Sequence, residues 1–203
     1  MRRSRVTVSH LALVVMISGF LASFGVALGE SATSVRVNVR AGGGPARAMI
    51  KISMPSDRVR EVARGDAGGS IAVPPGSYDL TVTCLELLDQ PTVTVSGVAV
   101  QGGKALVQEV TFPAGTVVVN VSYAGKLIPH LELLLRKRPG RVGAIPLPQL
   151  AASGVPFKLS PGQYEAEVTI PAGIHKAPRG DIKQTIDSID VVDGQTKTVS
   201  ASF

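Results

Sequence analysis

The chain contains an internal repeat, and this repeat restricts its possible fold more than any other feature of the sequence. Four landmarks of the first half recur in the same order in the second half. The four pairs are Ser34–Val39 with Thr116–Val121, Pro75–Val82 with Pro161–Val168, Val98–Gly102 with Asp190–Gly194, and Val110–Phe112 with Ala201–Phe203. A repeat of this kind predicts two copies of one structural unit. We expect the copies at residues 34–112 and 116–203.

Apolar and polar residues alternate within each copy, which is the period of β-strands. Turn signals rich in Gly and Pro separate the alternating stretches. The predicted strands lie near Val35–Arg40, Ala48–Ser53, Ser70–Val73, Tyr78–Cys84, Pro91–Val100 and Ala105–Phe112, then Thr116–Tyr123, Ile128–Arg136, Pro156–Leu159, Tyr164–Ile170, Thr185–Val192 and Thr196–Phe203. The pattern predicts an all-β protein with two tandem Greek-key-type β-sandwich modules. Only Pro113-Ala114-Gly115 separates the modules, so we expect them to touch or to hold a restricted angle.

The first residues predict a signal segment ahead of the modules. Arg2, Arg3 and Arg5 precede an uncharged apolar run from Leu11 to Leu28, and the sequence Ala27-Leu28-Gly29 fits the requirement of signal peptidase for small residues. We therefore expect residues 1–29 to be a signal peptide that is cleaved before Glu30. The alternative is an uncleaved membrane anchor, because a run of this length is at the lower limit for crossing a bilayer. In both cases the modules are expected to be exported, to the periplasm or the extracellular space.

Charge and composition argue against a nucleic-acid partner. The whole chain carries a net charge of +6, but three arginines lie in the signal segment, which leaves 18 basic and 15 acidic residues and a net charge of +3 in the modules. Aromatic residues make up only 4% of the chain, whereas nucleic-acid binding favours a clustered basic face with aromatic side chains. The single cysteine, Cys84, is in phase with Tyr78, Leu80 and Val82 on a predicted strand and is expected to be buried.

The order of these features resembles a known family. The pattern is an opening strand, a turn with Gly and Pro, a second strand, the sequence Pro-Gly-x-Tyr leading into an alternating strand, and a closing Gly-x-Thr strand. It resembles the carboxypeptidase regulatory-like, or transthyretin-like, β-sandwich, and it is similar to PEGA and pilin-type Cna-B modules. The resemblance covers nearly all of residues 34–203, twice over.

The resemblance implies a non-catalytic accessory or interaction module without a cofactor. The His-x-x-Glu pair of the zinc peptidase that accompanies some family members does not occur in this chain, and neither does the C-terminal Tyr-Arg-Gly-Ser of the transthyretin-like hydrolases. Cna-B modules often contain a Lys–Asn isopeptide bond. Candidates for such a bond here are Lys51 or Lys126 with Asn38 or Asn120.

Candidate metal ligands are few. Beyond the signal segment the chain has two histidines, His130 and His175, and we expect neither to bind a metal. Asp187, Asp190 and Asp193 are spaced like calcium ligands, but a spacing of three on a strand places neighbouring side chains on opposite faces. We expect these carboxylates to be solvated, and no metal site.

The densest positive cluster of the modules is formed by Arg136, Lys137, Arg138 and Arg141, at the end of a predicted strand and the start of a long loop. These side chains could contact an anionic envelope polymer, a lipid headgroup or an acidic envelope protein. They could equally be a solvated loop that discourages aggregation at a strand edge. Arg58, Arg60 and Arg64 are predicted to lie in the corresponding loop of the first module.

The sequence as a whole predicts a non-catalytic, exported binding or structural module of the cell envelope, which acts through loops or strand edges. The alternative is a small exported hydrolase whose site matches no common motif. One local prediction is specific enough to test. Tyr78 and Tyr164 should be equivalent, partly buried residues after tight turns, with Gly76 and Gly162 in backbone conformations that a side chain would strain.

Overall fold

The structure is a computed structural model that describes residues 33–138, 145–146, 153–171 and 181–203. The predicted signal segment, Arg141 and His175 lie outside the described residues. Residues 32–203 form one compact unit. Within the described ranges there is no helix of the length and apolarity needed to cross a membrane.

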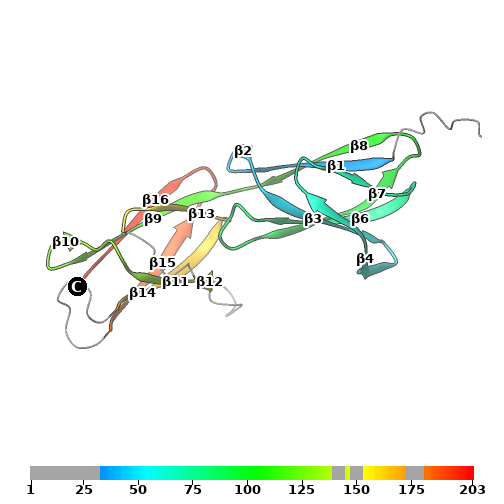
Figure 1. The fold of residues 1–203 in the computed structure, drawn as a ribbon. Helices are drawn as coiled ribbons and strands as arrows, with labels where there is room; N and C mark the ends of the chain where they lie inside the picture. Colours follow the sequence, from blue (N-terminus) through cyan, green and yellow to red (C-terminus); the bar gives the residue numbers. More distant parts are fainter. Residues whose placement is uncertain (1–32, 139–144, 147–152, 172–180) are drawn as a thin grey trace, which may run out of the picture. The chain divides into compact units, whose positions relative to one another are not determined.

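The first sandwich consists of two four-stranded sheets (Figure 1). In one sheet β1 (Ser34–Ala41) pairs with β8 (Ala105–Phe112) in parallel, and the short strands β2 (Gly44–Pro45) and β5 (Ser70–Ala72) share its other side. The second sheet is antiparallel and has the order β4-β3-β6-β7. Its strands are Asp57–Asp66 (β4), Ala48–Met54 (β3), Gly76–Cys84 (β6) and Thr92–Val100 (β7).

The second sandwich repeats this arrangement strand by strand. Its central strand β9 (Gly115–Tyr123) pairs in parallel with β16 (Thr196–Ser202) and antiparallel with β10 (Lys126–Leu127) and β13 (Pro156–Leu159). Its other sheet has the order β12-β11-β14-β15. The strands of that sheet are Ile145–Pro146 (β12), Glu132–Arg138 (β11), Gly162–Ile170 (β14) and Ile182–Val191 (β15). The predicted all-β fold of two tandem sandwich modules is confirmed.

Alternation along the strands explains why each pair of sheets packs face to face. In β1 the side chains of Val35, Val37 and Val39 are buried, whereas Arg36 and Arg40 are exposed. Burial of one face of each sheet removes apolar surface from water and is the main stabilising contribution. Two separate cores result, one in each sandwich. Cys84 lies in the first of them and is fully buried, as expected.

Two strand predictions were wrong. Arg58, Arg60 and Arg64 lie on strand β4, not in a loop. Because β4 is an edge strand and nearly all of its residues are exposed, it lacks the apolar alternation that would have revealed it. Strand β11 begins at Glu132 rather than Ile128, since Pro129 has no N–H to contribute to a ladder.

The two tyrosines are equivalent, as predicted, and both are buried. Tyr78 donates a hydrogen bond to the carbonyl oxygen of Pro74, and Tyr164 donates one to that of Ser160, each at 2.9 Å. Gly162 has a φ of +149°, which a side chain would strain. The same prediction was wrong for Gly76, whose φ lies outside the positive range. A Cβ there would instead lie 3.2–3.3 Å from the Tyr78 side chain.

Candidate functional site

Three residues of the predicted basic cluster, Arg136, Lys137 and Arg138, lie on β11, and the two arginines face acidic residues of neighbouring strands. Arg136 lies opposite Glu165 of β14 in the ladder, with Nη1 3.3 Å from Glu165 Oε1. Arg138 Nη2 lies 2.6 Å from Glu165 Oε2 and 3.5 Å from Asp187 Oδ1 of β15. A hydrogen bond from Arg138, and a smaller contribution from one donated by Arg136, lower the pKa of Glu165. Both guanidinium groups are thus largely balanced by carboxylates, and their contact with an anionic partner stays a prediction.

Lys137 belongs to a different environment, a polar cluster at the contact between the two sandwiches. We call it the Asp89 cluster; it consists of Asp89, Lys137, Ser160 and Tyr164. Asp89 comes from the loop between β6 and β7 of the first sandwich, and the other three residues come from the second. The Asp89 carboxylate accepts hydrogen bonds from the Ser160 N–H (3.0 Å) and the Ser160 hydroxyl. The Tyr164 hydroxyl, whose single proton is shared with the carbonyl oxygen of Ser160, also lies 3.0 Å from the carboxylate.

Lys137 supplies the positive charge that pairs with the Asp89 carboxylate. Its Nζ lies 3.4 Å from Asp89 Oδ2, donates a hydrogen bond to Ser160 Oγ, and lies 5.4 Å from the centre of the Tyr164 ring. The Asp89 side chain is only 6% exposed, whereas that of Lys137 is 41% exposed. A buried carboxylate needs hydrogen bonds and a countercharge to remain ionised, and this cluster provides both.

The backbone near Asp89 also contacts the second sandwich. Leu88 N donates a hydrogen bond to the carbonyl oxygen of Lys158 at 3.0 Å, next to the Asp89–Ser160 contact. The loop from the first sandwich therefore satisfies one backbone carbonyl of β13 and the N–H of Ser160, which directly follows this strand.

The short linker forms a second attachment between the sandwiches. Ala114 packs in the first core, and its N–H donates a 2.7 Å hydrogen bond to Asp193 Oδ1 while its carbonyl oxygen accepts one from Gly194 N at 2.9 Å. A Cβ on Gly115 would lie 2.5 Å from the carbonyl oxygen of Val192. The linker and the loop that carries Asp89 thus both form hydrogen bonds with residues of the second sandwich.

Comparison of the repeats shows that the Asp89 cluster is specific to the second sandwich. The register places Met54 at the position of Lys137, and Pro74 at that of Ser160. Only the tyrosine is shared. Sequence reasoning missed Asp89 and Ser160 because neither belongs to a motif. An alignment of the two repeats would have indicated the cluster, because the second repeat has Lys137 and Ser160 where the first has apolar residues.

The other predicted candidates are dispersed. Asp187 pairs with Arg138, whereas Asp193 binds the linker. Among the described residues no group of three His, Cys, Asp or Glu side chains could hold a metal ion. Lys51 of β3 donates to backbone carbonyls of β4, whereas Asn38 of β1 bonds Glu109 of β8 in the other sheet of this sandwich. The sandwich core separates Lys51 from Asn38, so these two residues cannot form an isopeptide bond.

The ionisation of Asp89 gives the cluster a predicted pH dependence. Burial acts to raise the pKa of Asp89, but hydrogen bonds from Ser160 and Tyr164 and the charge of Lys137 outweigh it and hold the pKa below its ordinary value. A carboxyl whose pKa is lowered by folding stabilises the protein above the unfolded-state pKa of about 4, and this stabilisation is lost as the pH falls through the folded-state pKa.

We therefore expect the urea midpoint of the wild type to fall more between neutral pH and about pH 3 than that of Asp89→Asn, which cannot titrate there. The two midpoints should differ at neutral pH and converge in acid. Parallel pH profiles for the two proteins would contradict the assignment of Asp89 as a buried, ionised carboxylate.

Comparison with known proteins gives no family. No family model matches the chain, and no curated protein matches it. Among solved structures it is similar to a candidate adhesin from Bacteroides ovatus, with 9% identity, a TM-score of 0.43 and coverage of 86% of this chain and 93% of that one. A candidate cell-adhesion protein from the same species has 10% identity, a TM-score of 0.39 and the same coverage.

A third similar structure is a leucine-rich repeat protein from Bacteroides thetaiotaomicron, with 15% identity and a TM-score of 0.30. The chain covers 85% of its own length in that match but spans only 26% of the other protein. Identities and TM-scores this low assign no function, so the function is argued below from the residues of this chain.

Proposed function

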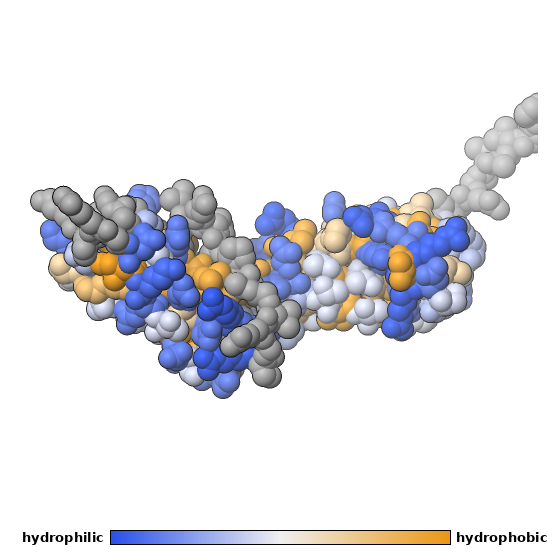
Figure 2. Space-filling model, turned by 90° about the horizontal axis from the view of Figure 1, so that it is seen from below, coloured by the Kyte–Doolittle hydropathy of each residue, from blue (hydrophilic) through white to orange (hydrophobic). Residues whose placement is uncertain are grey.

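We propose that the protein is a non-catalytic, exported binding or structural module of the cell envelope, in which two attached sandwiches present a strand edge to an extended segment of an envelope protein. The hydrogen-bonded sheets of the sandwiches support this role, because binding residues act best on a fixed scaffold. On the face shown in Figure 2, hydrophobic residues form small patches between hydrophilic ones. That face therefore offers no broad apolar contact surface.

The observation that carries the proposal is the composition of β7. This strand of nine residues ends its sheet, and among the described residues no strand pairs with its outer side. It contains no charged residue. The opposite edge strand, β4, contains Asp57, Arg58, Arg60, Glu61, Arg64 and Asp66. Proteins usually protect exposed edges with charges, and β7 lacks that protection.

The register shows which backbone groups β7 offers. Cys84 N donates to the carbonyl oxygen of Pro91, and Val93 and Val95 follow in the same phase of the ladder with β6. In an antiparallel pair the intervening residues direct their N–H and C=O away from the partner. Thr92 and Thr94 therefore present their backbone groups to the outer side, where a partner strand can pair with them.

Replacement of Thr94 by proline tests this edge. Thr94→Pro removes an outward N–H without removing a hydrogen bond to β6, so we expect it to abolish capture of the envelope partner while the stability changes by no more than about 1 kcal/mol. Thr94→Val is the matched control, since it changes the side chain but keeps the N–H. The measurement is retention of solubilised native envelope proteins on the immobilised chain, together with hydrogen-exchange protection of the Thr92 and Thr94 amides in the complex.

Equal retention by the wild type and Thr94→Pro would refute binding at β7. Retention that is lost in high salt, and in the double variant Arg136→Ser, Arg138→Ser, would instead assign binding to the predicted basic cluster. The double variant leaves Lys137 in place, so it does not disturb the Asp89 cluster.

A hydrolase would most readily use Ser160 as nucleophile with Lys137 as base, the only such pair found among the described residues. The geometry favours a structural role. Lys137 is ion-paired with Asp89, and the Ser160 hydroxyl donates to the same carboxylate instead of to the lysine. Ser160 and Tyr164 are also buried, whereas a nucleophile must be accessible to its substrate.

Two finer assignments are part of the proposal. We propose that the modules correspond to residues 34–112 and 116–203, and that they are members of the carboxypeptidase regulatory-like, or transthyretin-like, group. Support comes from the Pro-Gly-x-Tyr turns and from the identical strand order of the two sandwiches.

A further inference from the structure

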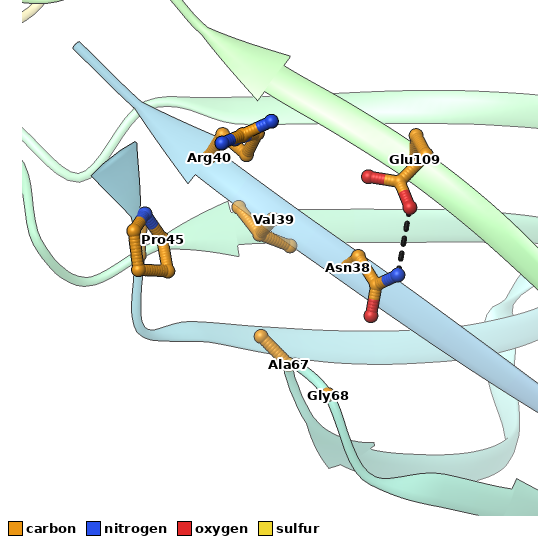
Figure 3. A pocket seen from close by; sticks show the side chains of 8 residues that line it. Asn38, Val39, Arg40, Pro45, Ala67, Gly68 and Glu109 are labelled. Atoms are coloured by element: carbon orange, nitrogen blue, oxygen red, sulfur yellow. Dashed lines mark hydrogen bonds between the residues drawn. The ribbon is translucent and has the colours of Figure 1, made fainter. Parts of the chain in front are cut away.

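A pocket of about 420 Å³ lies on the first sandwich, beside the central strand β1. It is lined by Asn38, Val39, Arg40, Pro45, Ala46, Ala67, Gly68 and Glu109. Figure 3 shows Asn38 and Arg40 on β1 with Glu109 on the neighbouring strand, and Pro45, Ala67 and Gly68 on the other side of β1. The volume of the pocket is within the range of roughly 300–1,000 Å³ that is typical of small-molecule sites.

The pocket occurs where the side of β1 is incompletely covered. Strand β5 pairs with the beginning of β1 and β2 with its end. Between them, Gly68 N donates to the carbonyl oxygen of Val37 (2.8 Å) and Ala46 N donates to that of Val39 (2.9 Å). The N–H of Val39 points to the same side as its carbonyl, because both groups of one residue point the same way in a strand.

The second sandwich has the same gap between the two short strands beside its central strand, and there a serine side chain fills it. Gly154 N donates to Val119 O (2.9 Å) and Ile128 N to Val121 O (3.0 Å), which repeats the two contacts above. In addition, Val121 N donates a 2.7 Å hydrogen bond to Ser153 Oγ. The residue corresponding to Ser153 in the first sandwich is Ala67, which has no side-chain acceptor. Among the described residues, no side chain of the first sandwich therefore replaces Ser153 Oγ as the acceptor for the Val39 N–H.

Two further differences between the repeats occur at the same place. The ladders align Arg40 with Ser122 and Glu109 with Ser200. The first sandwich thus has a guanidinium and a carboxylate where the second has two hydroxyls. Arg40 takes part in no ion pair among the described residues, and Glu109 accepts a single side-chain hydrogen bond, from Asn38 Nδ2 to Oε1 at 2.7 Å. Three differences that converge on one pocket point to a ligand with two unlike ends.

We propose that this pocket binds a small zwitterion of amino-acid or dipeptide size. Its carboxylate accepts from the Val39 N–H and the Arg40 guanidinium, which are both donors. Its ammonium group donates to Glu109, whose Oε2 remains open. The site is separate from the β7 edge, and its occupation does not depend on the function proposed above. Because Arg40 and Glu109 are exposed, binding is expected to be weak.

The test is an NMR titration of the ¹⁵N-labelled full chain with the dipeptide alanyl-alanine. We expect a saturable shift of the Val39 amide. Binding should weaken about fivefold to tenfold for N-acetyl-alanyl-alanine, which lacks the ammonium group, and for alanyl-alaninamide, which lacks the carboxylate. Ala67→Ser supplies the hydroxyl of the second sandwich and should reduce binding by a similar factor, and Arg40→Gln, on the exposed rim, should do the same without affecting folding.

The repeat provides the matched control. Ser153→Ala uncovers Val121 N in the second sandwich but leaves Ser122 and Ser200 in place of the charges, so the Val121 amide should show no saturable shift. The absence of a saturable shift at Val39 in the wild type would overturn the proposal. So would equal binding of the dipeptide and both blocked analogues, or equal binding by the wild type and Ala67→Ser.

Discussion

Replacement of Asp89 by alanine is expected to lower the free energy of unfolding by about 2–4 kcal/mol. The substitution leaves the Ser160 N–H, two hydroxyls and the Lys137 ammonium without their common acceptor. Loss of one partner from a buried ion pair costs about 3–5 kcal/mol. The cost here is lower because Lys137 is 41% exposed and can be rehydrated. Urea unfolding followed by circular dichroism measures the change.

The same variant should open the contact between the sandwiches. We expect faster hydrogen exchange at the Leu88 and Ser160 amides, both of which bond across this contact. Glu86→Ala is the control, because it removes a carboxylate from the same loop whose partner, Arg47, is exposed. That change should cost less than about 0.5 kcal/mol. An Asp89→Ala protein as stable as Glu86→Ala would show that the cluster does not hold the sandwiches together.

Replacement of Gly162 by valine is expected to cost about 1–3 kcal/mol, because a side chain is strained at a φ of +149°. A Cβ at this position would also lie 2.9 Å from Lys137 Cε. The lysine must move aside, and this movement takes its Nζ away from Asp89. Strain and loss of an ion pair therefore act together, and both should appear as a lower urea midpoint.

Gln163→Val is the appropriate comparison for this variant. It places the same β-branched residue on the same strand at an exposed position with no positive φ, so its stability should remain within about 0.5 kcal/mol of the wild type. Equal stability of the Gly162→Val and Gln163→Val proteins would contradict the conformational role assigned to Gly162.

The fold was predictable to the extent that burial leaves a trace in the sequence. Strands such as β1 and β9 bury alternate valines, so their period of two is visible without a structure. Strand β4 buries almost nothing, and its charged residues looked like a loop. The conformation of Gly76 could not be predicted from its resemblance to Gly162, since both glycines stand in the same Pro-Gly-x-Tyr pattern and only Gly162 has a positive φ.

The candidate sites were less predictable, because their residues come together only through register. Asp89 belongs to the first sandwich and Ser160 to the second, and no local sequence pattern connects them. The pocket beside β1 likewise depends on what is absent: Ala67 has no hydroxyl where Ser153 has one. Alignment of the two repeats residue by residue would have indicated both places, since Lys137, Ser160, Arg40 and Glu109 are positions where the copies differ in chemistry.

The parallel pairing of the first and last strands of each sandwich determines how the protein responds to tension. Because β1 and β8 run in the same direction along eight paired residues, the chain enters the sandwich at one end of the strand pair and leaves at the other. The same holds for β9 and β16. A pull on the two ends of a module thus acts along the strands and loads the hydrogen bonds of the ladder together, in shear, instead of opening them one after another. This connectivity is expected to give each sandwich mechanical strength without a disulfide.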